Sequence, residues 1–118
     1  MIRNELTYKV IGCAMRVHST LGNCLAIELA EAGLEFAREK EQTLYYKTFE
    51  VGIRRADFIV ENKIVVELKA LSSLEDVHLA QAKNYLTAYR FPIGLLINFG
   101  GVSLEYKLIF NKNSQSSF

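Results

Sequence analysis

Two short apolar runs separated by three polar residues constrain the fold of this chain more than any other feature. The first runs from Arg55 to Val60 and the second from Ile64 to Ala70. Both are rich in β-branched and aromatic residues, which is typical of buried strands. Each run nevertheless contains charged residues, which are costly to bury unless they pair or bind a ligand. The residues that need an explanation are Asp57, Glu67 and Lys69.

The loop between the two strands decides how these charges lie. Side chains alternate across a strand, so Glu67 and Lys69 share one face. A loop of two residues would oppose Asp57 to Val66 and send Glu67 to the other side. A loop of three residues, Glu61–Lys63, opposes Asp57 to Glu67, with their Cβ atoms about 5 Å apart. The two carboxylates are expected to meet provided that the loop has three residues.

Two adjacent carboxylates repel each other unless a cation lies between them. Mg²⁺ suits such a pair, because it takes oxygen ligands and is typically held by one or two carboxylates together with water and phosphate. Lys69 would then hold or activate a water molecule, or neutralise a phosphate. The alternative is structural, with Lys69 offsetting Asp57 and Glu67 in an ion-paired trio at the edge of the sheet.

Composition sets broad limits on the rest of the chain. Its 118 residues, half of them hydrophobic, suit one domain with a single core. No apolar stretch approaches the roughly 18 residues that span a bilayer, and no signal-peptide pattern opens the chain, so we expect a cytoplasmic protein without a membrane partner. The net charge of +1 requires any nucleic-acid contact to be a local basic patch. Cys13 and Cys24 are expected to be reduced thiols.

Hydrophobic periodicity predicts two helices, three or four strands, a third helix and two final strands. The expected helices cover 4–21, 24–32 and a segment capped by Ser72 or Ser73 that ends near residue 90. The expected strands cover 36–46, 49–51, 54–60, 63–69, 93–99 and 103–110. This order indicates a mixed α/β domain over residues 1–110, followed by a polar tail at 111–118.

Several sequence blocks, taken in order, resemble a known family. They are Val17-His18 with Leu21-Gly22, Arg55-Ala-Asp57-Phe, Val66-Glu-Leu-Lys69-Ala and Gly94-Leu-Leu-Ile-Asn98-Phe. Together they resemble the bacterial GxxExxY family of the PD-(D/E)XK nuclease superfamily, over nearly the whole chain up to about residue 110. The Asp57 and Glu67-Leu-Lys69 elements resemble the superfamily signature.

The resemblance implies a restriction-endonuclease-like αβββαβ core with a mixed central sheet flanked by helices. It implies that Asp57 and Glu67 bind one or two divalent ions, Mg²⁺ with Mn²⁺ as a substitute. The main-chain carbonyl of Leu68 would be a further ligand. Lys69 would be the catalytic lysine that assists the attacking water in phosphodiester hydrolysis. The reasoning from residue chemistry and the resemblance agree on Asp57, Glu67 and Lys69.

The helix that follows Lys69 carries a polar stripe. His78, Gln81 and Tyr85 recur at spacings of three and four residues, so they share one helix face. The spacing of Gln81 and Tyr85 resembles a motif that exonuclease-type members of the superfamily place beside the substrate. We expect a catalytic role for Gln81 and substrate binding by Tyr85, which could stack on a base. Alternatively, Tyr85 packs in the core and His78 caps the helix.

Other basic residues complete the expected nucleic-acid contacts. Arg55 is predicted to bind substrate, and Arg54, Lys63 and Lys83 could supply further phosphate contacts. His18 lies on the apolar stripe of the first helix, where a core histidine is the expected role.

One block of the family is missing. A Gly-x-x-Glu-x-x-Tyr sequence is expected after Leu21-Gly22, but the chain continues there with Asn23 and Cys24. In related nucleases an acidic residue of this region helps to bind the metal or position the substrate. Glu28 and Glu31 lie nearby and could replace it.

Three functions remain open at this point. The first is a Mg²⁺-dependent nuclease acting on DNA or RNA, impaired if the missing glutamate is essential. The second is a non-catalytic module of the same fold that binds nucleic acid or protein. The third is an α/β domain in which the charged trio is only an ion-pair cluster. The sequence does not separate DNA from RNA or endonuclease from exonuclease action, and it does not indicate a homo-oligomer.

Overall fold

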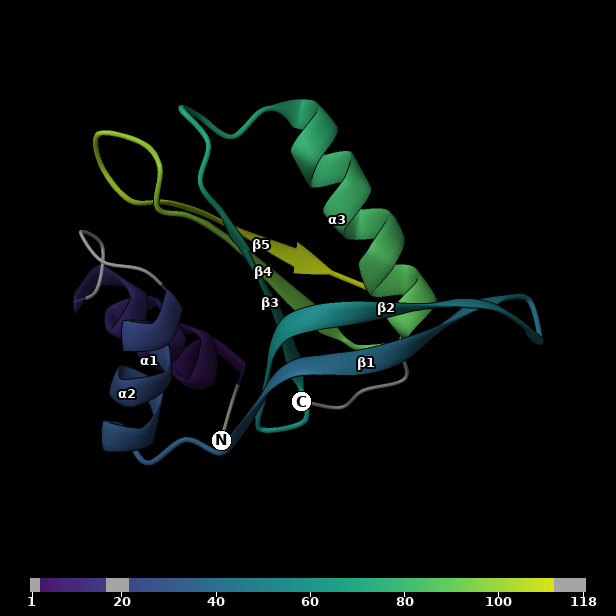
Figure 1. Cartoon of the computed structure of the whole chain (residues 1–118), viewed down its shortest axis with the longest axis horizontal. Coiled ribbons are helices and arrows are strands. Elements are labelled where there is room, and N and C mark those ends of the chain that lie inside the picture. The colour runs from purple at the N-terminus through teal and green to yellow at the C-terminus, as the bar shows by residue number, and fades with distance from the viewer. Residues whose placement is uncertain (1–2, 17–21, 112–118) are drawn as a thin grey trace.

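A mixed five-stranded sheet separates two helices on one face from a third helix on the other (Figure 1). The computed structural model describes residues 3–16 and 22–111. The helices are α1 (Arg3–Arg16), α2 (Gly22–Glu31) and α3 (Asp76–Tyr89). The strands are β1 (Phe36–Tyr46), β2 (Phe49–Val60), β3 (Ile64–Lys69), β4 (Ile93–Asn98) and β5 (Glu105–Phe110).

The strands lie in the sheet in the order of the sequence. Neighbouring strands are antiparallel except for β3 and β4, which are parallel and joined through α3. A tight turn joins only antiparallel strands. Two parallel neighbours need a longer crossover connection, because the chain has to return to the starting end of the sheet. The predicted fold class, a restriction-endonuclease-like αβββαβ core with helices on both faces, is confirmed.

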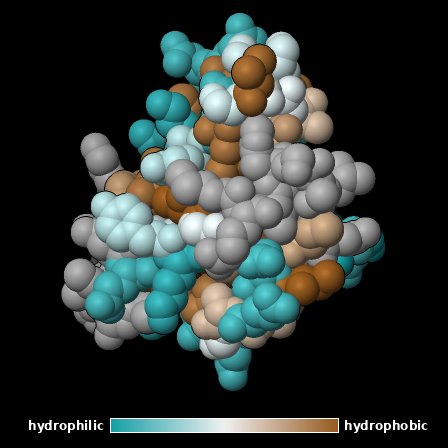
Figure 2. All heavy atoms as spheres, turned by 90° about the vertical axis from the view of Figure 1, so that its left-hand side faces the viewer, coloured by the Kyte–Doolittle hydropathy of each residue, from teal (hydrophilic) through white to brown (hydrophobic). Residues whose placement is uncertain are grey.

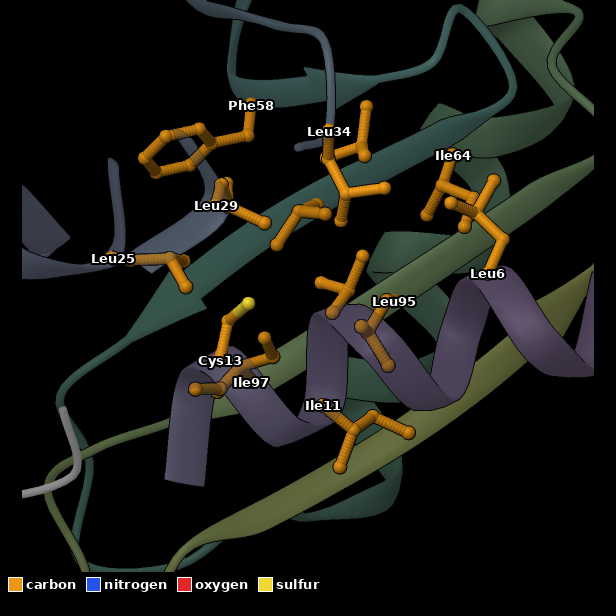
Figure 3. Close-up of a cluster of buried hydrophobic side chains, with 14 of the residues drawn as sticks. Leu6, Ile11, Cys13, Leu25, Leu29, Leu34, Phe58, Ile64, Leu95 and Ile97 are labelled. Atoms are coloured by element: carbon orange, nitrogen blue, oxygen red, sulfur yellow. The ribbon is translucent and has the colours of Figure 1, made fainter. Parts of the chain in front are cut away.

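A separate hydrophobic core lies against each face of the sheet. The core beside α1 and α2 is the larger, and Figure 3 shows helix side chains meeting those of the strands. Its fully buried members include Leu6, Val10, Leu25, Leu29, Phe58, Val60, Ile64, Val66, Leu95 and Ile97. The core beneath α3 contains Ala56, Ile59, Val65, Leu86, Tyr89 and Ile109. Seen from the side of α1 and α2, the hydrophobic residues that Figure 2 colours lie in separate patches among hydrophilic ones.

The hairpin that joins β2 and β3 has a three-residue loop, one of the two lengths that the sequence allowed. Glu61 and Asn62 both have positive φ angles, 52° and 54°, so the loop forms without a glycine. Asparagine tolerates this left-handed conformation better than most residues. The resulting register pairs Phe58 with Val66 and Val60 with Ile64. Apolar side chains of β2 and β3 therefore reach each core in matched pairs.

The third helix begins later than predicted. Its N-cap is Glu75, whose main-chain N–H donates to Nδ1 of His78 at 3.0 Å, so Ser72 and Ser73 do not cap it. The reason lies outside the helix, because the main-chain N–H of Leu74 donates to the Glu105 side chain at 3.0 Å. The chain leaving β3 is thus held against the β4–β5 connection before the helix can start.

Asn98 is the polar residue that fixes this part of the chain. It is fully buried at the end of β4, and its Oδ1 accepts the N–H of Leu71 at 2.8 Å. Its Nδ2 donates to the Leu71 carbonyl and to Glu105, both at 2.9 Å. Gly100 packs so closely that a Cβ would lie 2.5 Å from the main chain of Leu71. Together these contacts fix the segment that directly follows Lys69.

Other predicted features have mixed outcomes. The two predicted strands at 49–51 and 54–60 are one continuous strand, β2.

Asn111 is not part of a free tail, because its N–H donates to the Pro92 carbonyl and its side chain donates to the Phe91 carbonyl. Cys13 and Cys24 are reduced, as predicted, and the Sγ of Cys13 donates to the Glu28 carbonyl at 3.5 Å. His18 and residues 112–118 lie outside the described residues. Within 3–16 and 22–111, no helix is long and apolar enough to cross a bilayer.

We predict that Asn98→Ala lowers the free energy of unfolding by about 2–4 kcal/mol, because it leaves several buried main-chain groups without partners. Urea denaturation measures this change. Asn84→Ala is the matched control, since Asn84 is exposed on α3, and we expect it to cost less than about 0.5 kcal/mol. Equal effects of the two substitutions would show that the Asn98 contacts do not hold the segment.

Candidate active site

The alternation of side chains between the two faces of β2 is interrupted at Asp57, which we call the change of phase. Ala56 and Ile59 both belong to the core beneath α3, although regular alternation over three residues would place them on opposite faces. The pairing with β3 ends at Phe58. On the other side, Glu39, the residue of β1 across from Asp57, has a φ of 49°. Distortions of this kind re-aim side chains, and this one lies where β2 turns away from β3.

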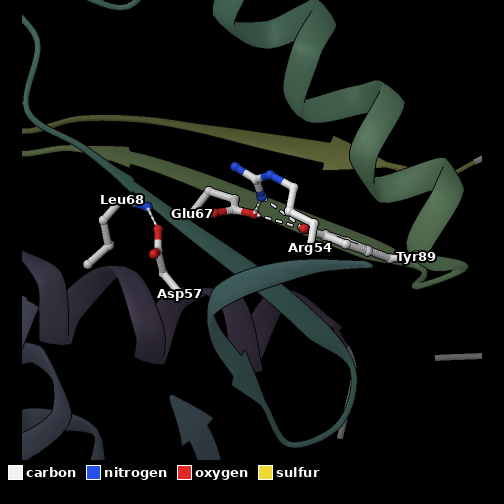
Figure 4. Close-up of polar contacts among 5 residues, drawn as sticks. All are labelled: Arg54, Asp57, Glu67, Leu68 and Tyr89. Atoms are coloured by element: carbon white, nitrogen blue, oxygen red, sulfur yellow. Dashed lines mark hydrogen bonds and ion pairs between the residues drawn. The ribbon is translucent and has the colours of Figure 1, made fainter. Parts of the chain in front are cut away.

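The carboxylate of Asp57 binds the main chain of β3 at this point. Its Oδ2 accepts the N–H of Leu68 at 2.8 Å, as Figure 4 shows. Because the ladder between β2 and β3 has ended, the side chain of Asp57 takes the place of a main-chain partner for Leu68. Asp57 therefore lies beside Glu67, the residue that precedes Leu68.

Glu67 lies on the α3 face of the sheet, two residues after Val65 on the same strand. Only 12% of its side chain is exposed, and its Oε1 accepts a hydrogen bond from Arg54 Nη1 at 2.5 Å. The same guanidinium nitrogen donates to the Tyr89 hydroxyl at 2.8 Å, and that hydroxyl lies 3.5 Å from Oε1. Figure 4 shows Arg54, Glu67 and Tyr89 meeting beneath α3.

Burial and neighbouring charges shift the pKa values of Glu67, Arg54 and Tyr89. The pKa of Glu67 is raised to about 7, chiefly by burial; Arg54 acts to lower this pKa, and the nearby Asp57 acts to raise it. Burial acts to lower the pKa of Arg54, but Tyr89 and Glu67 outweigh it and keep this pKa above its usual range. Burial also raises the pKa of Tyr89. Asp57 and Glu67 are thus close enough to repel each other.

A small hollow beneath α3 brings together several of the predicted site residues. Glu67 and Lys69 line it from β3, and Gln81 and Tyr85 line it from α3. The guanidinium of Arg54 lies over the Tyr85 ring, 4.0 Å from its centroid. The remaining lining residues are His78, Ala82 and Leu96. The polar stripe on the helix therefore does face Lys69, with Tyr85 also packing against the core beneath α3.

The two neighbouring arginines lie on opposite faces of β2. Arg54 reaches Glu67, whereas Arg55 is exposed and pairs with Glu41 of β1 in the strand register. Regular alternation back from Ile59 would have placed Arg55 beneath α3. The change of phase at Asp57 puts Arg54 there instead. Sequence reasoning therefore missed the contact between Arg54 and Glu67, although Arg54 was expected among the basic residues.

The described residues do not supply a third acidic ligand. Across 3–16 and 22–111, no group of three or more His, Cys, Asp or Glu side chains is placed to hold a metal ion. Glu28 belongs to α2, which lies on the opposite side of the sheet from α3 (Figure 1). The suggested replacement of the missing glutamate by Glu28 or Glu31 is therefore not supported. The oxygen donors that the structure does bring together are those of Asp57 and Glu67.

Comparison with known proteins assigns the chain to a family. Residues 4–109 match the family model described as the PD-(D/E)XK nuclease superfamily, and the chain belongs to that superfamily. Its fold is similar to that of the "Crystal structure of SSO0001", with a TM-score of 0.52 and 22% sequence identity. The match covers 73% of this chain and 45% of that one, so the chain spans less than half of its length. No curated protein matches.

We predict that stability falls as pH rises from about 4.5 to above 7. Folding raises the pKa of Glu67 from its ordinary 4.5 to about 7, so the folded state binds the proton more tightly. This contribution is complete below pH 4.5 and is lost as the pH passes 7. It amounts to roughly 3 kcal/mol at most, at about 1.4 kcal/mol per pH unit.

Urea denaturation in chelator at several pH values measures this dependence. Glu67→Gln removes the titrating carboxyl and should flatten it. Glu31→Gln, at an exposed position of α2, should retain the wild-type slope. The same slope in wild type and Glu67→Gln would contradict the assignment to Glu67.

Proposed function

We propose that the protein is a Mg²⁺-dependent nuclease that hydrolyses phosphodiester bonds in DNA or RNA, with Mn²⁺ as a substitute ion. The observation that carries this proposal is the meeting of two carboxylates at the point where β2 leaves β3. Asp57 binds the Leu68 N–H, and its charge raises the pKa of the adjacent, buried Glu67. Lys69 follows on the same strand face, toward the hollow beneath α3.

The chemistry of these donors fits a divalent ion. Nucleases of this superfamily usually use divalent metals. Two repelling carboxylates, held by the main chain and by burial, suit a hard cation that prefers oxygen ligands. Asp57, Glu67 and the main-chain carbonyl of Leu68 would hold the ion. When bound, such an ion would supply polarisation of a phosphoryl oxygen and a lowered pKa for a bound water.

The remaining residues act on the substrate. We assign Lys69 to orient the attacking water and to offset negative charge on the phosphate, because Lys69 lines the same hollow as Glu67. Gln81, exposed on α3, can donate to a phosphate oxygen or a water molecule. Tyr85 would bind the substrate through its ring or hydroxyl. Arg55 would contact a phosphate from the outer face of β2.

The finer assignments belong to the same proposal. The order of the sequence blocks supports membership of the GxxExxY family, even though the block that names the family is absent. A cytoplasmic location with nucleic acid as the partner is consistent with these assignments. The domain would comprise residues 1–110.

A second function is favoured by one specific observation. The described residues offer Asp57 and Glu67 without a third acidic side chain, and Arg54 already neutralises Glu67. A fold that had lost catalysis could keep such a pair and bind nucleic acid or protein without cutting. Measurement of cleavage separates this alternative from the nuclease.

We predict that the purified protein cleaves a labelled oligonucleotide with Mg²⁺ or Mn²⁺ and not with chelator. Single-stranded DNA, duplex DNA and RNA should each be tested. Glu67→Gln and Lys69→Met should each lower the rate at least about 100-fold, because each removes a group that acts in the transition state. Lys40→Gln, at an exposed position of β1, is the control for loss of one positive charge and should retain activity.

Binding measurements decide the alternative. Salt-dependent binding of the same oligonucleotides, with no metal-dependent cleavage by the wild-type protein, would support the non-catalytic module. Cleavage that Glu67→Gln and Lys69→Met leave unchanged would contradict the assigned site.

A further inference from the structure

Arg54 occupies the carboxylate that the proposed metal ion would need. Its Nη1 lies 2.5 Å from Oε1 of Glu67. Two tyrosines of α3 hold the same guanidinium, Tyr89 through its hydroxyl at 2.8 Å and Tyr85 through its ring at 4.0 Å. Such an arrangement neutralises a carboxylate of which only 12% is exposed.

A divalent ion and Arg54 compete for the same carboxylate, that of Glu67. A metal-binding carboxylate must be ionised, and in a buried position its charge must be compensated by a nearby cation. Arg54 provides that compensation within the chain itself. Binding of a metal ion by Glu67 therefore has to replace the contact with Arg54, at least at Oε1.

We propose that Arg54 is an exchangeable countercation of Glu67. It neutralises the carboxylate in the metal-free protein, releases it when the divalent ion binds, and then donates to a phosphate of the nucleic acid. This inference rests on the proposed function, because it assigns a regulatory role within the same site.

The surroundings of Arg54 suit such an exchange. Tyr85 and Tyr89 also contact the guanidinium, so the loss of the contact with Glu67 leaves two others in place. Arginine carries five N–H donors in a planar group, which suits it to both carboxylates and phosphates. The hollow beside it is lined by Lys69 and Gln81, the residues assigned to the substrate. A released Arg54 would therefore already face the position of the phosphate.

Calorimetric titration with Mn²⁺ alone tests the exchange. Arg54→Gln should bind Mn²⁺ about tenfold more tightly than wild type, because the ion no longer has to displace a charge-assisted hydrogen bond. Arg90→Gln is the matched control. Arg90 lies over a tyrosine ring, that of Tyr45 at 3.9 Å, and donates to the Lys47 carbonyl. It should change the affinity by less than about twofold.

A second variant separates the exchange from a loss of folding. Tyr89→Phe keeps the buried ring and removes the hydroxyl that accepts from Arg54 and donates to Glu67. Because both contacts hold the Arg54–Glu67 pair together, this variant should tighten Mn²⁺ binding by a smaller factor, about threefold. Circular dichroism checks that each variant is folded. If Arg54→Gln does not fold, the result for Tyr89→Phe decides, and unchanged or weaker Mn²⁺ binding by this variant overturns the proposal.

The phosphate step has its own readout. In a Lys69→Met background that prevents turnover, Arg54→Gln should weaken binding of a labelled oligonucleotide about fivefold with Mn²⁺ present, and less than about twofold in chelator. Tighter binding of metal together with weaker binding of nucleic acid is the expected signature. A residue with only a structural role would not move the two affinities in opposite directions.

The outcomes also distinguish this inference from the function on which it rests. If wild type cleaves with Mn²⁺ but Arg54→Gln binds the ion equally or more weakly, the countercation role fails and the nuclease stands. If Mn²⁺ binds neither wild type nor Arg54→Gln, both proposals fail.

Discussion

The register of the β2–β3 hairpin is the constraint on which the rest of the structure depends. Side chains alternate with a period of two along a strand, so a shift of one residue would exchange the two faces of β3. The loop Glu61–Lys63 prevents that shift by adopting positive φ at two positions. It directs Val66 into the core beside α1 and α2, and Val65 into the core beneath α3. Glu67 then follows Val65 to the face where Arg54 and the polar stripe of α3 lie.

The same register brings two negative charges together, and neighbouring groups compensate them. A carboxylate at position 67 is largely buried, and a second one, Asp57, lies beside it. Ionised groups in such surroundings require compensation. The Leu68 N–H compensates Asp57, while Arg54 and Tyr89 compensate Glu67. The protein thereby keeps two repelling carboxylates together, although burial still raises the pKa of Glu67.

The sequence predicted most of the fold and the central residues of the candidate site. Apolar periodicity located most of the helices and strands. The sequence left a loop of two or three residues between β2 and β3 open, and the structure shows the three-residue loop. The errors arose where distant parts of the chain meet. Ser72 and Ser73 are good caps in isolation, but contacts from Asn98 and Glu105 fix the chain there and delay the start of α3.

The contact between Arg54 and Glu67 could not be derived from the alternation of side chains along β2, for a related reason. Alternation back from Ile59 assigns Arg55 to the α3 face, and only the change of phase at Asp57 places Arg54 there. Such a distortion depends on where β2 leaves β3, which is a property of the whole sheet. Two consecutive arginines before an acidic strand residue are a signal that either could face the carboxylates. Only the structure shows which of the two arginines lies on the α3 face of β2.

The central claim is that Asp57 and Glu67 share one divalent ion. Crystals of the wild-type protein grown with Mn²⁺ would test it most directly, through the anomalous scattering of manganese. The account predicts an anomalous peak between the two carboxylates, beside the main-chain carbonyl of Leu68, with Arg54 no longer bound to Oε1 of Glu67. A protein that binds Mn²⁺ elsewhere, or shows no peak while the Arg54–Glu67 pair stays intact, would contradict it.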